Sequence, residues 1–139
     1  MRILITGSEG RIGSSLKKLL SDHTLMLVDK KTEFNLAKEP MNEIVEFEPE
    51  IVFHLAASFE RTDETPLFLG INFMDNMQAT LRLNQAIANI KSIHTVVFAS
   101  SYLVYDPNLY LHLKPNSGFS INEEASINPR NLCGASKFY

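Results

Sequence analysis

Residues 2–16 read RILITGSEGRIGSSL, and this stretch decides the fold. The apolar, β-branched run 2–6 ends at a glycine, which predicts a buried strand. From residue 12 to residue 20 the apolar side chains recur at helical spacing, which predicts a helix. Between the two lie Gly7, Gly10 and Gly13, spaced G-x-x-G-x-x-G. The stretch therefore predicts a strand, a tight turn and a helix in direct succession.

The three glycines have different roles in a turn of this kind. The first permits the tight turn, the second lets the backbone approach a pyrophosphate, and the third lets the helix pack close to the strand. The start of the helix offers free N–H groups and a partial positive charge to the phosphates. The alternative is a glycine-rich turn that binds no ligand. A P-loop is excluded, because no Gly-Lys-Ser/Thr follows.

The rest of the chain alternates strands with helices. Apolar runs predict three more buried strands, at 24–28, 50–55 and 94–99. A short helix is expected at 40–47, opened by Pro40 in its first turn. A long helix is expected at about 70–91, with Met74, Met77 and Leu81 in the core on one face. The chain is irregular after Ser100, and a helix restarts near Leu132.

This order of elements predicts the architecture. Strands that alternate with helices imply right-handed crossovers and a parallel sheet. Because the strands are continuous apolar runs, we expect helices on both of their faces. The predicted class is α/β, a Rossmann-type doubly wound parallel sheet. The last helix stops soon after it starts. Residues 1–139 are therefore expected to form one nucleotide-binding domain, truncated so that C-terminal strands and a substrate region are missing.

Composition excludes several classes of function. The net charge of −3 argues against a nucleic-acid surface. No apolar stretch is long enough for a membrane span, and no signal peptide opens the chain. One cysteine rules out an internal disulfide and fits a reducing compartment. The four histidines are scattered, so no metal site is predicted. A cytoplasmic location is expected from these absences.

Asp29 ends the second predicted strand, where an acid would hold the ribose hydroxyls of NAD. The alternative is an ordinary aspartate at a strand end. Lys30 and Lys31 follow it and could attract the 2′-phosphate of NADP instead. The Asp29 carboxylate would repel that phosphate, so NAD is favoured over NADP.

Five motifs now coincide in order. They are TGSEGRIG (6–13), FHLAAS (53–58), NMQATLRL (76–83), FASSYLVY (98–105) and INEEASINPRNLCGASK (121–137). Together they resemble the extended short-chain dehydrogenase/reductase family, in particular its NAD-dependent sugar-nucleotide epimerases and dehydratases. Ala79 stands where that family has a glycine. The resemblance covers nearly the whole chain. It implies hydride transfer through bound nicotinamide, with a nucleotide sugar as substrate and, as an open alternative to a monomer, a homodimer.

The resemblance implies a role for particular residues. The pyrophosphate would lie against Gly7, Gly10, Arg11, Ile12 and Gly13. The adenosine would be held by Asp29, Lys30, Asn35 and Leu36. Further cofactor contacts are expected from Leu55, Ala56, Ala57 and Asn76. Ser101 matches the catalytic serine, and Lys137 matches the lysine that binds the nicotinamide ribose and lowers the pKa of the catalytic tyrosine.

Cys133 stands in the place of that tyrosine, four residues before Lys137. A thiol has a suitable pKa, which Lys137 could lower, but its sulfur reaches much less far than a phenol oxygen. Four accounts stay open. In the first, Cys133 serves as the acid–base group, and in the second, another shuttle replaces it, such as Ser101 through water or a residue beyond position 139. In the third, the protein binds cofactor without this chemistry, and in the fourth, the cysteine is a deliberate or accidental replacement.

Other interpretations are weaker. Tyr110 and Lys114 also spell Y-x-x-x-K, but alternating leucines predict an extended segment there, which would not align the two side chains. A non-catalytic NAD(P)-binding sensor or scaffold of the same fold is the second hypothesis for the whole chain. A methyltransferase that uses a different nucleotide cofactor is the third.

Overall fold

Four parallel strands form one sheet in the order β2-β1-β3-β4. The structure is a computed structural model that describes residues 1–59, 65–113, 118 and 120–138. The strands are β1 (Arg2–Thr6), β2 (Thr24–Val28), β3 (Ile51–His54) and β4 (Thr95–Phe98). The first two have the predicted bounds, and the other two are shorter than predicted by one residue at each end. The prediction of an α/β fold with a parallel sheet is confirmed.

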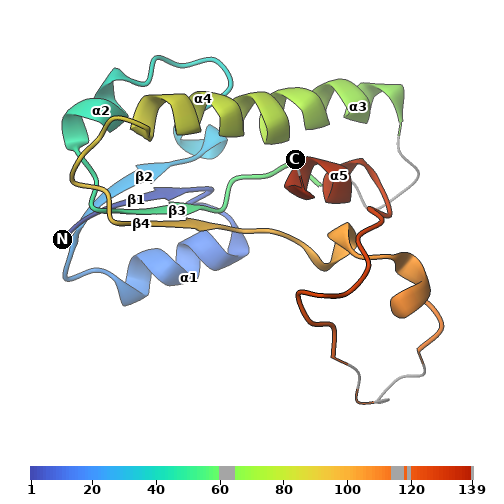
Figure 1. The fold of residues 1–139 in the computed structure, drawn as a ribbon. Coiled ribbons are helices and arrows are strands. Elements are labelled where there is room, and N and C mark those ends of the chain that lie inside the picture. Colours follow the sequence, from blue (N-terminus) through green and yellow to red (C-terminus); the bar gives the residue numbers. More distant parts are fainter. Residues whose placement is uncertain (60–64, 114–117, 119, 139) are drawn as a thin grey trace.

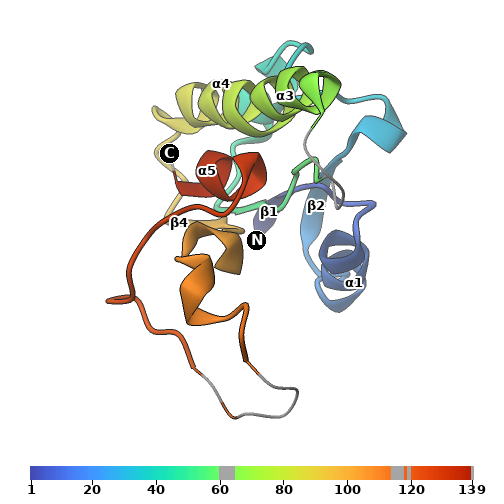
Figure 2. The same cartoon turned by 90° about the vertical axis from the view of Figure 1, so that its right-hand side faces the viewer.

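Helices cover the sheet unequally (Figure 1). α1 (Arg11–Leu19) lies below the sheet, and α2 (Asn42–Phe47) lies above it together with a long helix. The long helix consists of α3 (Pro66–Asn72), a π-helical segment Phe73–Gln78 and α4 (Ala79–Ile87). Figure 2, turned by 90°, shows α5 (Leu132–Phe138) between that helix and the segment after β4. Helices therefore lie on both sides of the sheet, as a doubly wound fold requires.

Two helix starts differ from prediction. α2 begins at Asn42, so Pro40 lies before the helix and not in its first turn. The long helix begins at Pro66, earlier than predicted, because Thr65 caps it: its side-chain oxygen accepts a hydrogen bond from Phe68 N at 3.1 Å. Proline has no backbone N–H. This costs nothing at the first helical position, because an N–H there would have no partner within the helix.

The prediction that Met77 and Leu81 lie in the core is wrong. Their exposed fractions are 40% and 57%, and only Met74 of that predicted face packs against the core. Leu81 lies two residues before the buried Leu83 in the regular helix α4, and residues two apart on an α-helix do not share a face. The buried face instead carries Asn76, Ala79, Leu83 and Ile87.

The core lies between the sheet and the upper helices. Its fully buried members include Leu4, Val52, Ile44 and Leu83. β4 is different: all four of its residues are exposed, so the expectation that helices cover both faces of every strand is wrong there. β4 is the edge strand and pairs only with β3 within the described residues. Among all the residues that the structure describes, no helix is long and apolar enough to cross a bilayer.

The segment after β4 is irregular, as predicted. It contains two 3₁₀ turns, η3 (Tyr102–Val104) and η4 (Pro107–Leu109), and one isolated antiparallel bridge between Tyr105 and Ile127. The extended segment predicted around Tyr110 is wrong, because Pro107 opens a turn of helix in front of it. Tyr110 packs edge-on against Tyr102, and Lys114 lies outside the described residues.

Candidate functional site

The glycine turn is pressed against the neighbouring strand end. Gly7 has φ of 72°, and a Cβ there would lie 2.7 Å from the backbone nitrogen of Ala56. A Cβ on Gly13 would lie 2.2 Å from the carbonyl oxygen of Gly7. Both positions therefore require glycine, the first for its backbone conformation as well as for space. α1 can then begin close to the carboxyl end of β1.

A pocket of about 290 Å³ opens at the carboxyl ends of β1, β2 and β3. Those ends lie side by side because Thr6 pairs in register with both Val28 and His54. Of the predicted cofactor-binding residues, the pocket is lined by Gly7, Gly10, Asp29, Lys30, Asn35, Leu36, Leu55, Ala56 and Ala57. Residues from three separate parts of the sequence thus meet at one edge of the sheet, where ligands of open α/β sheets bind.

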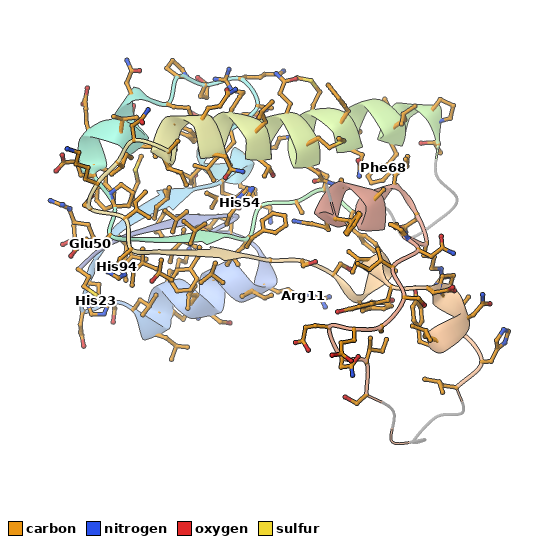
Figure 3. All side chains as sticks on the ribbon, viewed as in Figure 1. Arg11, His23, Glu50, His54, Phe68 and His94 are labelled. Atoms are coloured by element: carbon orange, nitrogen blue, oxygen red, sulfur yellow. The ribbon has the colours of Figure 1, made fainter. Side chains whose placement is uncertain are left out.

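The remaining predicted cofactor residues lie elsewhere. Arg11 and Ile12 are exposed in the first turn of α1, and Figure 3 shows Arg11 near the helix start that faces the strand ends. Gly13 is buried against the turn. Asn76 and Lys137 line a second, larger pocket.

The start of α1 has free capacity for an anion. Its N-cap is Gly10, which provides no side-chain hydrogen bond, and its first turn contains no acidic residue. The hydroxyl of Ser8 is buried in the same turn and has no hydrogen-bond partner in the described part of the chain. A nine-residue helix with an uncapped N-terminus and a nearby unpaired hydroxyl is suited to a phosphate.

Asp29 is held in place by the backbone on both sides. One carboxylate oxygen accepts a hydrogen bond from Glu9 N at 2.9 Å, and the other accepts one from Lys31 N at 2.9 Å. A carboxylate has about four lone-pair positions, so about two remain for hydroxyl donors in the pocket. The side chain is therefore fixed by the protein and still able to bind a diol.

Asp75 and Ser58 also line this pocket, and neither was predicted as a cofactor contact, although Ser58 ends the FHLAAS motif. The Asp75 carboxylate accepts hydrogen bonds from Lys30 Nζ at 2.5 and 2.6 Å and from Ser58 Oγ at 2.5 Å. Asp75 belongs to the π-helical segment, and π-bulges are frequent at functional sites. The spacing of hydrophobic residues does not reveal a π-helical segment. The sequence therefore indicates only an ordinary polar position on a helix at Asp75.

Asn76 fixes the strand-end loop to the long helix. Its Oδ1 accepts a hydrogen bond from Ser58 N at 2.7 Å, and its Nδ2 donates to Ser58 O at 2.9 Å. The amide thus replaces a backbone partner for the loop after β3, whose Ser58 lines the first pocket. Nδ2 also lies 3.3 Å from Ser136 Oγ on α5.

His54 connects β1, β3 and α4 through a directed chain of hydrogen bonds. Thr80 Oγ1 donates to Asn76 O at 2.5 Å, so it accepts from His54 Nε2–H at 2.8 Å. His54 Nδ1 then accepts from the Thr6 hydroxyl at 2.7 Å, and Thr6 Oγ1 in turn accepts from Ala56 N–H at 3.2 Å. This chain requires the neutral imidazole. Figure 3 shows His54 between the sheet and the long helix.

The environment of His54 favours the neutral form. Burial, together with the positive charge of Lys137, lowers the pKa of His54 to about 4. The ring packs against Phe98 with 5.5 Å between the centroids. His54 is therefore a neutral structural link in the range of physiological pH.

The predicted catalytic residues lie on two elements that pack together. Cys133 and Lys137 lie one turn apart on α5, with exposed fractions of 5% and 9%. Ser101 caps η3, and its Oγ accepts a hydrogen bond from Leu103 N at 3.2 Å. A Cβ on Gly134 would lie 2.3 Å from Leu103 O, so α5 contacts η3 with no room for a side chain. The helix that carries the thiol is thus fixed beside the turn that follows Ser101.

Lys137 lies in a largely apolar environment. Its Nζ is 4.5 Å from the centroid of the Phe98 ring, a cation–π contact. Burial lowers the pKa of Lys137, and the charge of Cys133 opposes that shift. The second pocket, of about 820 Å³, is lined by Lys137, Ser136 and Phe98 together with His54 and residues of the long helix. A buried ammonium beside this pocket is a candidate for binding or proton transfer.

Comparisons with known proteins agree with this geometry. Residues 3–139 match the NAD dependent epimerase/dehydratase family. A UDP-glucose 4-epimerase of Mycolicibacterium smegmatis is 31% identical over 125 residues, an alignment that covers 73% of this chain and 39% of that protein.

Solved structures give the same result. A crystal structure of a UDP-galactose 4-epimerase matches with a TM-score of 0.76 and 26% identity, over 99% of this chain and 48% of that one. A short-chain dehydrogenase/reductase superfamily protein from Agrobacterium tumefaciens, crystallised with bound NAD, matches with a TM-score of 0.76 and 25% identity, over 99% and 42%. The chain therefore spans less than half the length of these relatives.

Proposed function

The chain belongs to the NAD dependent epimerase/dehydratase family. From this premise we propose that it binds NAD as part of an epimerase or dehydratase that acts on a nucleotide sugar. The observation that carries the proposal is the pocket at the ends of β1, β2 and β3, with its glycine turn, uncapped helix start and fixed Asp29. The nucleotide sugar is proposed because two of the matched relatives are epimerases of UDP-hexoses.

Each part of the pocket has a role in this proposal. The N–H groups at the start of α1 bind the pyrophosphate, and Gly7 and Gly10 leave room for it. Asp29 accepts hydrogen bonds from the adenosine ribose, while Asn35 and Leu36 border the adenine. Leu55, Ala56 and Ala57 form the opposite wall. NAD is favoured over NADP because the carboxylate of Asp29 repels a 2′-phosphate.

The catalytic assignment follows from α5 and the turn after β4. Bound NAD would supply hydride transfer to and from a substrate carbon. Lys137 contributes a positive charge and a hydrogen-bond donor, and Ser101 contributes a hydroxyl. Cys133 lies one helical turn before Lys137, but its side chain is short and only 5% exposed. Proton transfer between the thiol and a substrate therefore needs a bridging water or a shifted substrate.

A titration tests cofactor binding. We expect NADH to bind the wild-type chain with a measurable heat in calorimetry. The Asp29→Asn variant should bind NADH at least about tenfold more weakly, because hydrogen bonds to a charged acceptor are lost. Asp22→Asn, an exposed position before β2, is the matched control and should leave the affinity unchanged. Absence of any heat with NAD⁺ or NADH would refute the proposal.

A second candidate is a non-catalytic NAD-binding sensor or scaffold, and Cys133 is the observation that favours it. Epimerisation of UDP-glucose by wild type, Cys133→Ala and Cys133→Tyr distinguishes the accounts. Turnover that Cys133→Ala abolishes identifies the thiol as the acid–base group, and turnover that it leaves intact identifies another shuttle. Gain of turnover in Cys133→Tyr alone indicates a lost proton donor. NADH binding without turnover in all three supports the sensor. A cytoplasmic location and a homodimer remain predictions from the sequence.

A further inference from the structure

Lys30 is already engaged by a carboxylate that is distant in sequence. Its Nζ lies 2.6 and 2.5 Å from the two oxygens of Asp75. The Lys30 side chain is 52% exposed, whereas that of Asp75 is 9% exposed. Asp75 is also held by the hydroxyl of Ser58 at 2.5 Å. The aspartate is therefore the fixed partner, and the lysine is the mobile one that it restrains.

Lys30 and Asp75 both line the pocket in which Asp29 is proposed to hold the adenosine ribose. Lys30 directly follows Asp29 at the end of β2, and Asp75 reaches the same pocket from the π-helical segment. In dinucleotide-binding folds, a cation beside the acid at this strand end accommodates the 2′-phosphate of NADP. Lys30 occupies such a position, yet its charge is compensated by Asp75.

We infer that Asp75 is a specificity-determining residue: it holds the Lys30 ammonium in an ion pair and so withholds it from a 2′-phosphate, which favours NAD over NADP. This inference rests on the proposed function, because it concerns the same pocket. Asp75 acts in two ways. It neutralises the cation that would attract the phosphate, and it adds a second carboxylate to that of Asp29 in the pocket lining.

The neighbouring Lys31 provides an internal comparison. Its side chain is exposed, and its backbone N–H is the donor to Asp29. Both lysines line the pocket, but the pairing with Asp75 belongs to Lys30. If Asp75 controls specificity by restraining a cation, the effect of removing Asp75 must depend on Lys30 and not on Lys31.

Fluorescence titrations with NADH and NADPH test the inference. We expect the wild type to prefer NADH. Asp75→Asn keeps the side-chain shape and an acceptor for Ser58 but removes the charge. It should bind NADPH about tenfold more tightly while its affinity for NADH changes by less than about threefold, since a freed ammonium gains a charge-assisted hydrogen bond to phosphate. Asp75→Asn combined with Lys30→Ala should lose the gain, and Asp75→Asn combined with Lys31→Ala should keep it.

The outcomes separate this inference from the proposed function. If the wild type binds neither coenzyme, the proposed function fails. If it binds NADH but Asp75→Asn leaves the ratio of the two affinities unchanged, only the role of Asp75 is refuted. A gain that survives Lys30→Ala also refutes it, because the freed cation was not the cause. Asp75→Ser, which is smaller and retains a hydroxyl for Ser58, replaces Asp75→Asn if that variant does not fold.

Discussion

The neutral state of His54 makes the stability of the fold depend on pH. In the folded protein the pKa of His54 is about 4, whereas its ordinary value is 6.5. Between these values the unfolded chain binds a proton that the folded chain does not. Acid therefore favours unfolding there, and the contribution of His54 is fully present above about pH 6.5 and is lost as the pH falls towards 4.

The size of the effect follows from the two pKa values. One unit of pKa corresponds to about 1.4 kcal/mol, so the limiting loss is about 3 kcal/mol at a pH below both values. Between pH 7 and pH 5 the expected loss is about 2 kcal/mol, because the unfolded chain is mostly protonated at pH 5. The charged group that contributes to this shift is Lys137 on α5, whose positive charge adds to the cost of a second one on the ring.

Urea denaturation followed by circular dichroism measures this loss. The free energy of unfolding of the wild type should fall by about 2 kcal/mol from pH 7 to pH 5. His54→Gln should lose most of that dependence, whatever its stability at pH 7. His112→Gln, in which the replaced side chain is exposed, should behave as the wild type. Equal pH dependence in wild type and His54→Gln would refute the reasoning. If the variant does not fold, NMR titration of the His54 ring in the wild type decides the question.

Three glycine substitutions give further predictions. Gly13→Ala should prevent α1 from packing on the turn, since its Cβ would meet Gly7 O at 2.2 Å, and calorimetry should detect loss of both stability and NADH binding. Gly134→Ala should lower the free energy of unfolding by about 1–3 kcal/mol, because its Cβ would lie 2.3 Å from Leu103 O; an unchanged midpoint in urea would contradict the packing of α5 on η3. Gly70→Ala, inside α3 with no atom within 4 Å of the new Cβ, should raise stability by about 1 kcal/mol in the same assay.

The sequence was sufficient to predict the strands of the sheet, because each strand is a short apolar run bounded by a turn residue. The long helix was predicted, but not the phase of its faces. Apolar residues lie on more than one face of this helix, so their spacing did not show that Leu83 and Ile87 face the core while Leu81 points outward. The π-helical segment Phe73–Gln78 was not predicted either, and its Asp75 and Asn76 contact Ser58.

The candidate site was predictable where local sequence carries the chemistry. Gly7, Gly10 and Asp29 lie in recognisable positions and line the same pocket. Asp75 was not predictable, because its partner Lys30 lies 45 residues away and only the folded chain brings them together. The role of His54 was equally hidden. A histidine inside an apolar strand gives no indication of which hydroxyls it will meet, and Thr6 and Thr80 come from different elements.

Cofactor binding and proton transfer depend on different parts of the molecule, so one can persist without the other. The first pocket is built from the strand ends, the glycine turn and the π-helical segment. Cys133 lies on α5, where Gly134 packs against η3 with no room for a side chain, and it does not line that pocket. Lys137 on the same helix is likewise held by Phe98. A change at position 133 therefore alters the reach of the proton donor while leaving the dinucleotide pocket intact. A chain with this architecture can retain its cofactor whether or not the thiol supports turnover, and activity alone is not a measure of whether the pocket is formed.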